Sequence, residues 1–366
     1  MPWYNLVSVS IDLTKLKNNF LLLKQKHGFL WPVIKADAYG HGLLAVAKAL
    51  IEAGASGFCV GSVEEAVVLR LLPFDGQILS LLGPVSSKDC ALLVEHKILP
   101  VIHNFEQLRL LKQTLKRPFT IALKFDTGMA RLGFDLEDID RIQTTLQDSN
   151  LKPVLLLSHL ATADVAEDKF VLEQLEVFRL ITSRFQRAGF RLKASLANSA
   201  GILGWPETYF DLARPGIALY GANPFAQSKW EKKGAGLTEA MQVTAPIISV
   251  HDLKKGQTIS YGRTFTAPKN LRVAIIAIGY ADNYSRLCSN QGKIIVNGKK
   301  CPVLGRVCMQ MLAIDVTGLE VRTGAQAFVL GGNEPKISVH ELAKWWQTIP
   351  YEVFCLLGQN KRRYIN

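Results

Sequence analysis

The feature that most constrains the fold of this chain is a regular alternation of short apolar runs with amphipathic segments before Gly234. Segments with apolar residues three and four positions apart are typical of surface helices, as at residues 43–53, 63–71, 105–115 and 170–187. Continuous apolar runs between such helices are typical of parallel strands buried on both faces. Eight runs of this kind are found: residues 31–35, 57–60, 77–81, 100–102, 120–125, 154–158, 193–196 and 210–214.

Eight alternating units predict a (β/α)8 TIM-like barrel, an α/β fold in which parallel strands close into a ring. A doubly wound open sheet is the alternative. That fold typically has a Gly-x-Gly-x-x-Gly turn after its first strand, and this sequence has none there. The barrel is therefore the favoured architecture.

The pattern changes after Gly234. Short β-type runs, such as residues 293–296, follow one another and are separated by turn signals such as Asn297-Gly298. A short helix is expected near the end, over residues 339–346. We therefore expect a barrel domain over residues 1–234 and a mainly antiparallel β-domain over residues 235–366. Residues 1–12 have no position in the barrel, so we expect them to pair with the β-domain.

The charge balance favours anionic partners. The chain carries 43 Lys and Arg against 31 Asp and Glu, a net charge of +12, which suits phosphate cofactors, acidic metabolites or nucleic acid. The basic residues are dispersed, and their densest clusters are not interleaved with aromatic residues, so we expect no nucleic-acid role.

The cellular setting is predicted from what the sequence lacks. No apolar run approaches the ~18 residues of a membrane span, and the N-terminus does not resemble a secretory signal. The six cysteines are scattered, without a Cys-x-x-Cys pair. We expect a cytoplasmic protein with reduced thiols, no membrane association and no metal site.

The segment Val33 to Gly42, Val-Ile-Lys-Ala-Asp-Ala-Tyr-Gly-His-Gly, combines chemically useful groups in ten residues. Burial at the end of a strand disfavours the charged form of an amine, and this makes the amine a nucleophile able to form a Schiff base. Lys35 ends the first apolar run and is the candidate. Taken alone, the segment fits equally well a solvated lysine followed by a glycine turn.

Further candidate groups follow other predicted strands, whose C-terminal ends form the active site of a barrel. Arg131 follows the fifth run, His159 the sixth and Ser199 the seventh, while Arg214 ends the eighth. Each has an ordinary explanation, since a lone histidine is most often structural and Asn-Ser-Ala-Gly is a common helix start. Their joint position favours a functional site.

The loops after the seventh and eighth strands of barrels often bind phosphate. Ser199 offers a hydroxyl, and Gly216 after Pro215 lets backbone N–H groups approach an anion. A reactive lysine facing such a site suggests pyridoxal 5′-phosphate (PLP), which carries both an aldehyde and a phosphate.

At this point the chain resembles the alanine racemases, PLP-dependent barrel enzymes that interconvert L- and D-alanine. The segment around Lys35 is similar to the family's PLP-lysine signature. The resemblance extends over nearly the whole length through motifs in the family's order: residues 126–133, Asn198-Ser199, 214–221, Ser260-Tyr261-Gly262, Gly279-Tyr280-Ala281-Asp282, 305–309 and Tyr351-Glu352.

The resemblance implies roles for these residues. Lys35 would form the Schiff base with PLP and act as one base. Tyr261 would be the opposite base in the other subunit's site of a head-to-tail homodimer. Arg214 would donate to the pyridine nitrogen. The groups implied to hold the phosphate are Tyr39, Ser199, Gly216, Ile217 and Tyr351.

The substrate side is implied in the same way. Arg131 would bind near the carboxylate of alanine, together with the partner-derived backbone of Met309. Lys124 occupies the place of a lysine that is carbamylated in several relatives and orients this arginine. His159 would bond Tyr261 across the dimer, and Tyr280 would line the entrance.

Two bases on opposite faces can racemise a substrate without turning it over. A tyrosine hydroxyl has an ordinary pKa of about 10, so Tyr261 needs help to become an anion. We expect that help from His159 held by Arg214, because a positive neighbour favours the charged form. Arg214 beside the pyridine nitrogen would keep that nitrogen unprotonated and suppress side reactions such as transamination.

The sequence leaves alternatives. Gln310 stands where the family usually has Asp, so substrate affinity or dimer contacts are expected to differ. A racemase of broader specificity, acting on serine or lysine, is one alternative. A PLP-dependent decarboxylase is disfavoured by Arg214, and a non-catalytic PLP protein is disfavoured by Tyr261. The leading hypothesis is an alanine racemase that supplies D-alanine for peptidoglycan.

Overall fold

The computed structural model describes residues 6–366, which divide into two compact units. One unit contains Lys17–Ala38 and Leu43–Leu237. The other contains the residues up to Leu16, the short segment Tyr39–Gly42 and Thr238–Asn366. Within this described part, no helix combines the length and the apolar character that crossing a membrane requires.

The first unit is built on a six-stranded parallel sheet in the order β2-β3-β4-β5-β6-β7. Its fully buried aliphatic side chains, such as Ile121 and Leu155, form the core. The strands are β2 (Gly57–Val60), β3 (Gln77–Ser80), β4 (Leu99–Ile102), β5 (Phe119–Lys124), β6 (Leu151–Leu157) and β7 (Lys193–Ser195).

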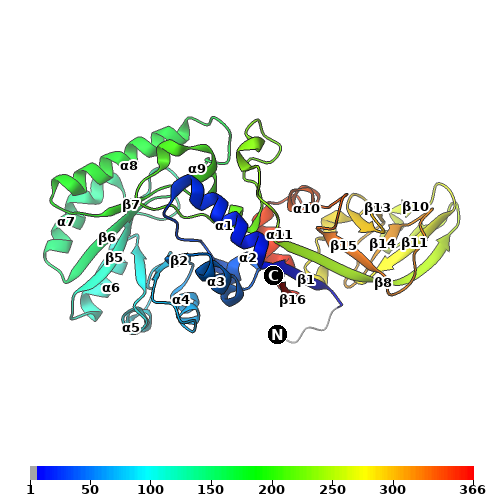
Figure 1. Cartoon of the computed structure of the whole chain (residues 1–366), viewed down its shortest axis with the longest axis horizontal. Helices are drawn as coiled ribbons and strands as arrows, with labels where there is room; N and C mark the ends of the chain where they lie inside the picture. The colour runs from blue at the N-terminus through cyan, green and yellow to red at the C-terminus, as the bar shows by residue number, and fades with distance from the viewer. Residues whose placement is uncertain (1–5) are drawn as a thin grey trace. The chain divides into compact units, whose positions relative to one another are not determined.

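Helices connect these strands and lie around the sheet (Figure 1). Most begin at a side-chain cap; Ser86 and Asn104, for example, accept hydrogen bonds from the backbone N–H groups of the first turn. The helices are α1 (Leu13–His27), α3 (Leu43–Glu52), α4 (Val63–Leu69), α5 (Ser87–Glu95), α6 (Phe105–Thr114), α7 (Ile139–Gln147), α8 (Phe170–Arg187) and α9 (Ser199–Gly204).

An irregular segment stands where the first strand was expected, at residues 31–35. It makes one parallel bridge to β2, between Val33 and Cys59. Pro32 has no N–H group to donate, and a missing donor limits the hydrogen-bond ladder. The result is a single bridge instead of a regular strand.

A second irregular segment, residues 210–214, closes the ring. Ala213 forms a parallel bridge with Leu30, and the Leu212 N–H donates to the carbonyl of Ala194 in β7 over 3.3 Å. The six strands and the two irregular segments together occupy eight positions. The predicted (β/α)8 barrel is confirmed, with its first and last strands reduced to bridges.

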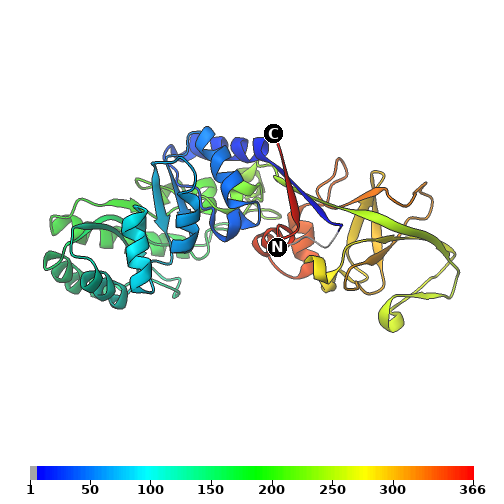
Figure 2. The same ribbon diagram turned by 90° about the horizontal axis from the view of Figure 1, so that it is seen from below.

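The second unit is built on an eight-stranded sheet in the order β11-β14-β13-β12-β15-β8-β1-β16, with β11 also paired to β8. Six strands thus close into a ring, and the predicted antiparallel β-domain is confirmed. The long strand β8 is seen in Figure 2. The strands are β1 (Ser8–Asp12), β8 (Met241–Leu253), β11 (Leu271–Ile276), β12 (Lys293–Val296), β13 (Lys299–Leu304), β14 (Leu312–Asp315), β15 (Gln326–Leu330) and β16 (Lys361–Ile365).

Local signals explain several features of this sheet. Asn297 and Gly298 have φ angles of 47° and 74° and connect β12 to β13, as a tight hairpin turn with two left-handed residues requires. Strand β1 lies between β8, to which it is antiparallel, and β16, to which it is parallel. The first strand of the described residues therefore belongs to the sheet of the second unit. Residues 1–5 of the segment expected to pair there lie outside the described residues.

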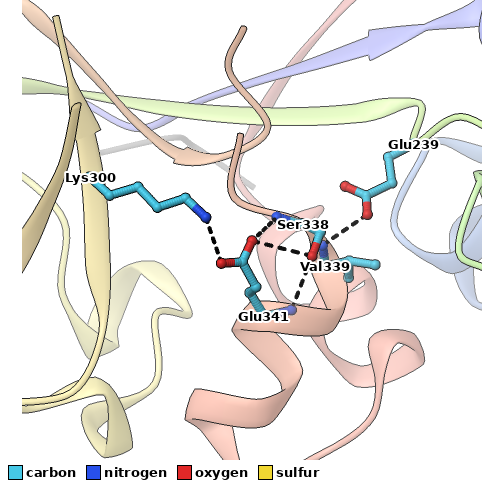
Figure 3. A network of polar contacts seen from close by, with 5 residues as sticks. All are labelled: Glu239, Lys300, Ser338, Val339 and Glu341. Atoms are coloured by element: carbon cyan, nitrogen blue, oxygen red, sulfur yellow. Dashed lines mark hydrogen bonds and ion pairs between the residues drawn. The ribbon is translucent and has the colours of Figure 1, made fainter. Parts of the chain in front are cut away.

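The helices α10 (Val339–Trp346) and α11 (Pro350–Leu357) complete the second unit. Figure 3 shows the polar contacts at the start of α10. Ser338 and Glu341 form a reciprocal cap, Lys300 forms an ion pair with Glu341 at 2.6 Å, and Glu239 accepts from the Val339 N–H at 3.0 Å. Burial raises the pKa of Glu239 to about 7.

Candidate active site

Basic side chains gather at the C-terminal ends of the barrel strands. Lys35, Lys124, Arg131 and Arg214 all act electrostatically on His159, which follows β6. Burial is the larger cause, and together with these positive charges it lowers the pKa of His159 to about 3. His159 is therefore uncharged at neutral pH. The positive charge near it comes from Arg214 and the lysines, a distinction that the sequence did not provide.

Arg214 is the most deeply placed of these cations, with 5% of its surface exposed. Its guanidinium donates to the Ser195 hydroxyl and to the Ser158 carbonyl. Burial lowers its pKa to about 10, so the group stays charged at neutral pH. The structure thus provides a fixed positive charge at the base of the barrel mouth.

A buried amide holds the loop that carries His159. The Gln174 side chain, from α8, donates to the His159 carbonyl at 3.1 Å and accepts from the Ala161 N–H at 2.8 Å. It also donates to the Thr127 hydroxyl, which lies 2.9 Å from that of Ser158. These contacts fix the backbone of His159 relative to the end of β5.

Lys124 is the last residue of β5 and is half-buried. Burial lowers its pKa to about 8, and the charges of Arg131 and Arg214 contribute in the same direction, against an opposing effect of Asp126. A lysine with this pKa is partly neutral at physiological pH. Its amine is therefore available as a nucleophile.

The Asp126 carboxylate shapes the loop that follows. It accepts from the N–H groups of Gly128 at 2.7 Å, Met129 at 2.9 Å and Arg131 at 3.1 Å. Burial raises its pKa, but the backbone donors outweigh this and hold the pKa below the ordinary value. A small pocket lies at this loop; its lining is Lys124, Phe125, Asp126, Met129, Arg131, Leu132, Ser158 and His159.

The barrel residues predicted to bind the phosphate, Ser199, Gly216 and Ile217, lie close together. Ser199 begins α9, and its hydroxyl oxygen accepts from the N–H groups of Gly216 at 2.9 Å and Ala218 at 3.2 Å. Ile217 begins the short 3-10 turn η3 (Ile217–Tyr220). The Ser199 hydroxyl keeps its own hydrogen to donate, and it lies at the start of a helical turn, where an anion is favoured.

Lys35 begins an unusual turn, labelled α2 (Lys35–Tyr39). Ala36, Asp37 and Ala38 have φ angles of 52° to 54° and ψ angles of 46° to 53°, so the backbone is left-handed. For residues with a side chain this conformation costs about 1–2 kcal/mol each. Lys35 itself is exposed, so the expectation of a buried amine at a strand end is wrong for this structure.

Tyr39 and Tyr351, both expected at the phosphate, lie close together in the second unit. Their ring centroids are 5.8 Å apart. The backbone of Gly40 approaches that of Gly358, beyond the end of α11, so closely that a Cβ on Gly358 would lie 2.1 Å from the Gly40 carbonyl oxygen. Only glycines allow this contact, which places the two tyrosines side by side.

Three other predicted residues belong to the second unit and are exposed. Tyr261, Tyr280 and Met309 have exposed fractions of 71%, 45% and 57%. The Tyr280 N–H donates to the Cys308 carbonyl at 3.1 Å, and the Ser260 hydroxyl lies 3.4 Å from the Cys308 sulfur. These contacts bring Tyr280 and the segment that carries Tyr261 to Cys308, the residue directly before Met309.

Ser260, which precedes Tyr261, is strained. Its φ and ψ angles are 67° and 178°, a region that is almost restricted to glycine and costs about 1–3 kcal/mol. Its hydroxyl donates to the Arg306 carbonyl at 2.5 Å. The strain is therefore held by a hydrogen bond directly before the candidate base. Gln310 is exposed in the same region.

Sequence reasoning missed Glu65, whose carboxylate accepts from the N–H of Ala36 and from that of Gly61. The available signal was Ser62-x-x-Glu65, the spacing of a helix cap. That spacing indicates the start of a helix and does not predict a contact with a distant loop.

Comparisons with known proteins agree with this arrangement. Residues 11–224 match the family profile described as "Alanine racemase, N-terminal domain", and residues 240–365 match "Alanine racemase, C-terminal domain". An alanine racemase of Nitratidesulfovibrio vulgaris (strain DSM 19637 / Miyazaki F) is 46% identical over 366 residues, which cover 99% of this chain and 98% of that protein. A catabolic alanine racemase of Pseudomonas putida is 37% identical over 358 residues, covering 97% of this chain and 98% of that protein.

Solved structures give the same result. The biosynthetic alanine racemase of Pseudomonas aeruginosa superposes with a TM-score of 0.90 at 32% identity, covering 99% of this chain and 100% of that one. An alanine racemase of Bartonella henselae, described with covalently bound pyridoxal phosphate, has a TM-score of 0.87 at 30% identity, covering 98% and 99% of the two chains.

Proposed function

This chain belongs to the alanine racemase family, and we propose that it interconverts L- and D-alanine with Lys35 and Tyr261 as bases on opposite faces of the substrate. It is an isomerase by its family and its fold. The observation that carries the assignment of residues is the cationic barrel mouth, where Lys35 and Arg214 act on the same uncharged His159.

The barrel mouth fits PLP by the chemistry of its donors. Lys35 offers an amine, and Arg214 offers a buried positive charge. The Ser199 hydroxyl, held by Gly216 beside the turn that begins at Ile217, offers a site for a phosphate. Tyr39 and Tyr351 would add two hydroxyl groups at the phosphate. When bound, PLP supplies an aldehyde that bonds to amines and an aromatic ring that accepts electrons from the substrate Cα.

The protein's own groups would hold and move the proton. Starting from L-alanine, the Tyr261 phenolate oxygen would take the Cα proton, and Lys35 Nζ would return a proton on the other face. Starting from D-alanine, the two groups exchange roles. Arg131 would hold the substrate carboxylate, with the Met309 backbone beside it and Tyr280 at the entrance. Lys124, as a carbamate, would orient Arg131.

The absence of charge on His159 limits the role that it can have toward Tyr261. A neutral imidazole with so low a pKa stays unprotonated, so it can take part only in a hydrogen bond with the Tyr261 hydroxyl. Arg214 supplies the positive field that favours the tyrosine anion. Arg214 stays charged and is held by Ser195 and Ser158, so it would keep its proton. It could donate a hydrogen bond to a pyridine nitrogen without protonating it.

A head-to-tail homodimer would supply Tyr261 to the partner's barrel. The exposed Tyr261, Tyr280, Met309 and Met311 form a group of large apolar side chains on one domain, which is typical of an interaction surface. We also propose that the enzyme works in the cytoplasm and supplies D-alanine for peptidoglycan. The free thiols of Cys59, Cys90, Cys288 and Cys301 are compatible with a reducing compartment.

The activity is tested by incubating the purified protein with L-alanine and PLP and measuring D-alanine with a D-amino-acid oxidase. We expect D-alanine to accumulate until both enantiomers are equal. Serine and lysine, tested in parallel, separate a strict alanine racemase from a broader one. Absence of any D-isomer would refute the proposal.

The two bases are tested by substitution. Lys35→Ala is expected to abolish turnover in both directions together with the visible absorbance of lysine-bound PLP. Tyr261→Phe is expected to lose turnover from L-alanine while retaining removal of the Cα deuteron from [2-²H]-D-alanine, because only the Lys35 face remains active. Equal, mild losses from both enantiomers would contradict the two-base assignment.

A further inference from the structure

We propose that Glu65 is a positioning residue whose carboxylate fixes the backbone that carries Lys35; the inference rests on the proposed role of Lys35 as a base. Glu65 lies in the first turn of α4, outside every motif that pointed to the reaction. It would act through the backbone that follows two adjacent barrel positions, without touching the substrate.

The carboxylate of Glu65 joins the irregular segment that ends at Lys35 to the end of strand β2. One oxygen, Oε1, accepts from the Ala36 N–H at 2.6 Å, and the other, Oε2, accepts from the Gly61 N–H at 2.6 Å. Ala36 directly follows Lys35, and Gly61 directly follows β2. Hydrogen bonds from N–H groups to a carboxylate are shorter and roughly twice as strong as those between neutral groups.

We call the two hydrogen bonds of Glu65, from Ala36 and from Gly61, the Glu65 clamp. Its Ala36 bond is made where the backbone is left-handed. Ala36 is the first left-handed residue of the turn, with φ 52° and ψ 53°. N–H groups in the first turn of a helical segment have no acceptor within that segment. A carboxylate that takes up this N–H therefore favours the left-handed turn over the extended backbone that alanine otherwise prefers.

Gly61 brings the clamp against Lys35 itself. A Cβ at residue 61 would lie 3.0 Å from Glu65 Oε2 and 3.6 Å from the Cβ of Lys35. The glycine thus leaves room for the carboxylate over the backbone, beside the first carbon of the lysine side chain. The position from which Lys35 extends is set by this three-residue packing.

Ordinary helix capping accounts for the Gly61 contact but not for the Ala36 contact. In α5 the carboxylate of Asp89 accepts from the N–H groups of Ser86 and Val85, both at the start of its own helix. In α4 the Ser62 hydroxyl accepts from the Glu65 N–H at 3.2 Å, as a cap does. The other oxygen of the Glu65 carboxylate, however, accepts a hydrogen bond from Ala36, which lies 29 residues away in the chain.

The test compares Glu65→Gln and Glu65→Ala with Glu64→Gln in the PLP-loaded enzyme. Glu64 is the exposed neighbour in the same helical turn and carries the same charge, so its variant controls for the helix dipole and for net charge. Glutamine keeps one acceptor oxygen but turns an NH2 group toward the second N–H. Glu65→Gln is therefore expected to fold even where Glu65→Ala is less stable.

Three measurements separate positioning from general stability. Amide hydrogen exchange at Ala36 is expected to become about tenfold faster or more in both Glu65 variants. The value of kcat is expected to fall about tenfold from each enantiomer, with KM for alanine changed less than twofold. The Glu64→Gln variant should match the parent in exchange and in kcat.

The proposal is overturned if Glu65→Gln behaves like Glu64→Gln in exchange and in kcat. It is also overturned if KM rises while kcat is unchanged, since that would be a loss of binding and not of alignment. The results would differ if the proposed racemase function itself were wrong. The parent would then not racemise alanine, while the exchange of the Ala36 amide would still report whether the clamp exists.

Discussion

Lys124 offers a sharp test of the electrostatics at the barrel mouth. Its amine lies among the positive charges of Arg131, Arg214 and Lys35, with Asp126 as the negative charge that acts on it. Reaction of the neutral amine with carbon dioxide forms an N–C bond, releases a proton and leaves a carbamate anion. We expect this carbamate because it replaces one of several crowded cations with a negative charge.

The size of the effect follows from the lowered pKa. At pH 7 an amine with a pKa of about 8 is roughly one-tenth neutral, whereas an amine at 10.5 is about 0.03% neutral. The reactive fraction of Lys124 is therefore about 300 times that of an ordinary lysine. As the pH falls through 8 toward 6, protonation competes with carbon dioxide, so the carbamate is expected to decline.

The assay is ¹³C NMR of the protein equilibrated with ¹³C-bicarbonate at pH 8 and at pH 6. We expect a carbamate signal at pH 8 that weakens at pH 6 and is absent in Lys124→Gln. The control is Lys152→Arg, an exposed lysine on the neighbouring strand β6, which should leave the signal intact. In Lys124→Gln, KM for alanine should rise about tenfold or more, because Arg131 loses an anionic partner. A signal that survives in Lys124→Gln, or no signal at pH 8, refutes the reasoning.

Three further outcomes are expected. Gly358→Ala should destabilise the protein by roughly 1–3 kcal/mol, since its Cβ would lie 2.1 Å from the Gly40 carbonyl oxygen; a melting temperature equal to the parent's would contradict this packing. The imidazole NMR signals of His159 should stay constant between pH 5 and 8, because its pKa is about 3, and a midpoint within that range would count against burial among cations. Glu239, whose pKa is raised to about 7, should contribute stability at low pH that is lost as the pH rises through 7. Between pH 5 and 8, the free energy of unfolding in urea should therefore fall by about 1–3 kcal/mol less in Glu239→Gln than in the parent. The same pH dependence in both proteins would contradict this expectation.

The sequence determined the fold class because periodicity is a local property. Strand β12 and helices α8 and α10 begin and end at the residues expected from apolar spacing and turn signals. The first and last barrel strands were less predictable. A proline and irregular pairing reduced them to single bridges, and such pairing depends on neighbours far away in the chain.

The sequence also determined which residues to consider at the site, since Lys35, Tyr261 and Arg214 stand in motifs of recognisable spacing. Only the tertiary structure decided their surroundings. It made His159 neutral by placing it, half-buried, among cations, folded the Lys35 segment into a left-handed turn, and brought Glu65 to the Ala36 N–H. Charge, strain and a hydrogen bond across 29 residues arise from groups that meet only in the folded chain, so no local pattern in the sequence encodes them.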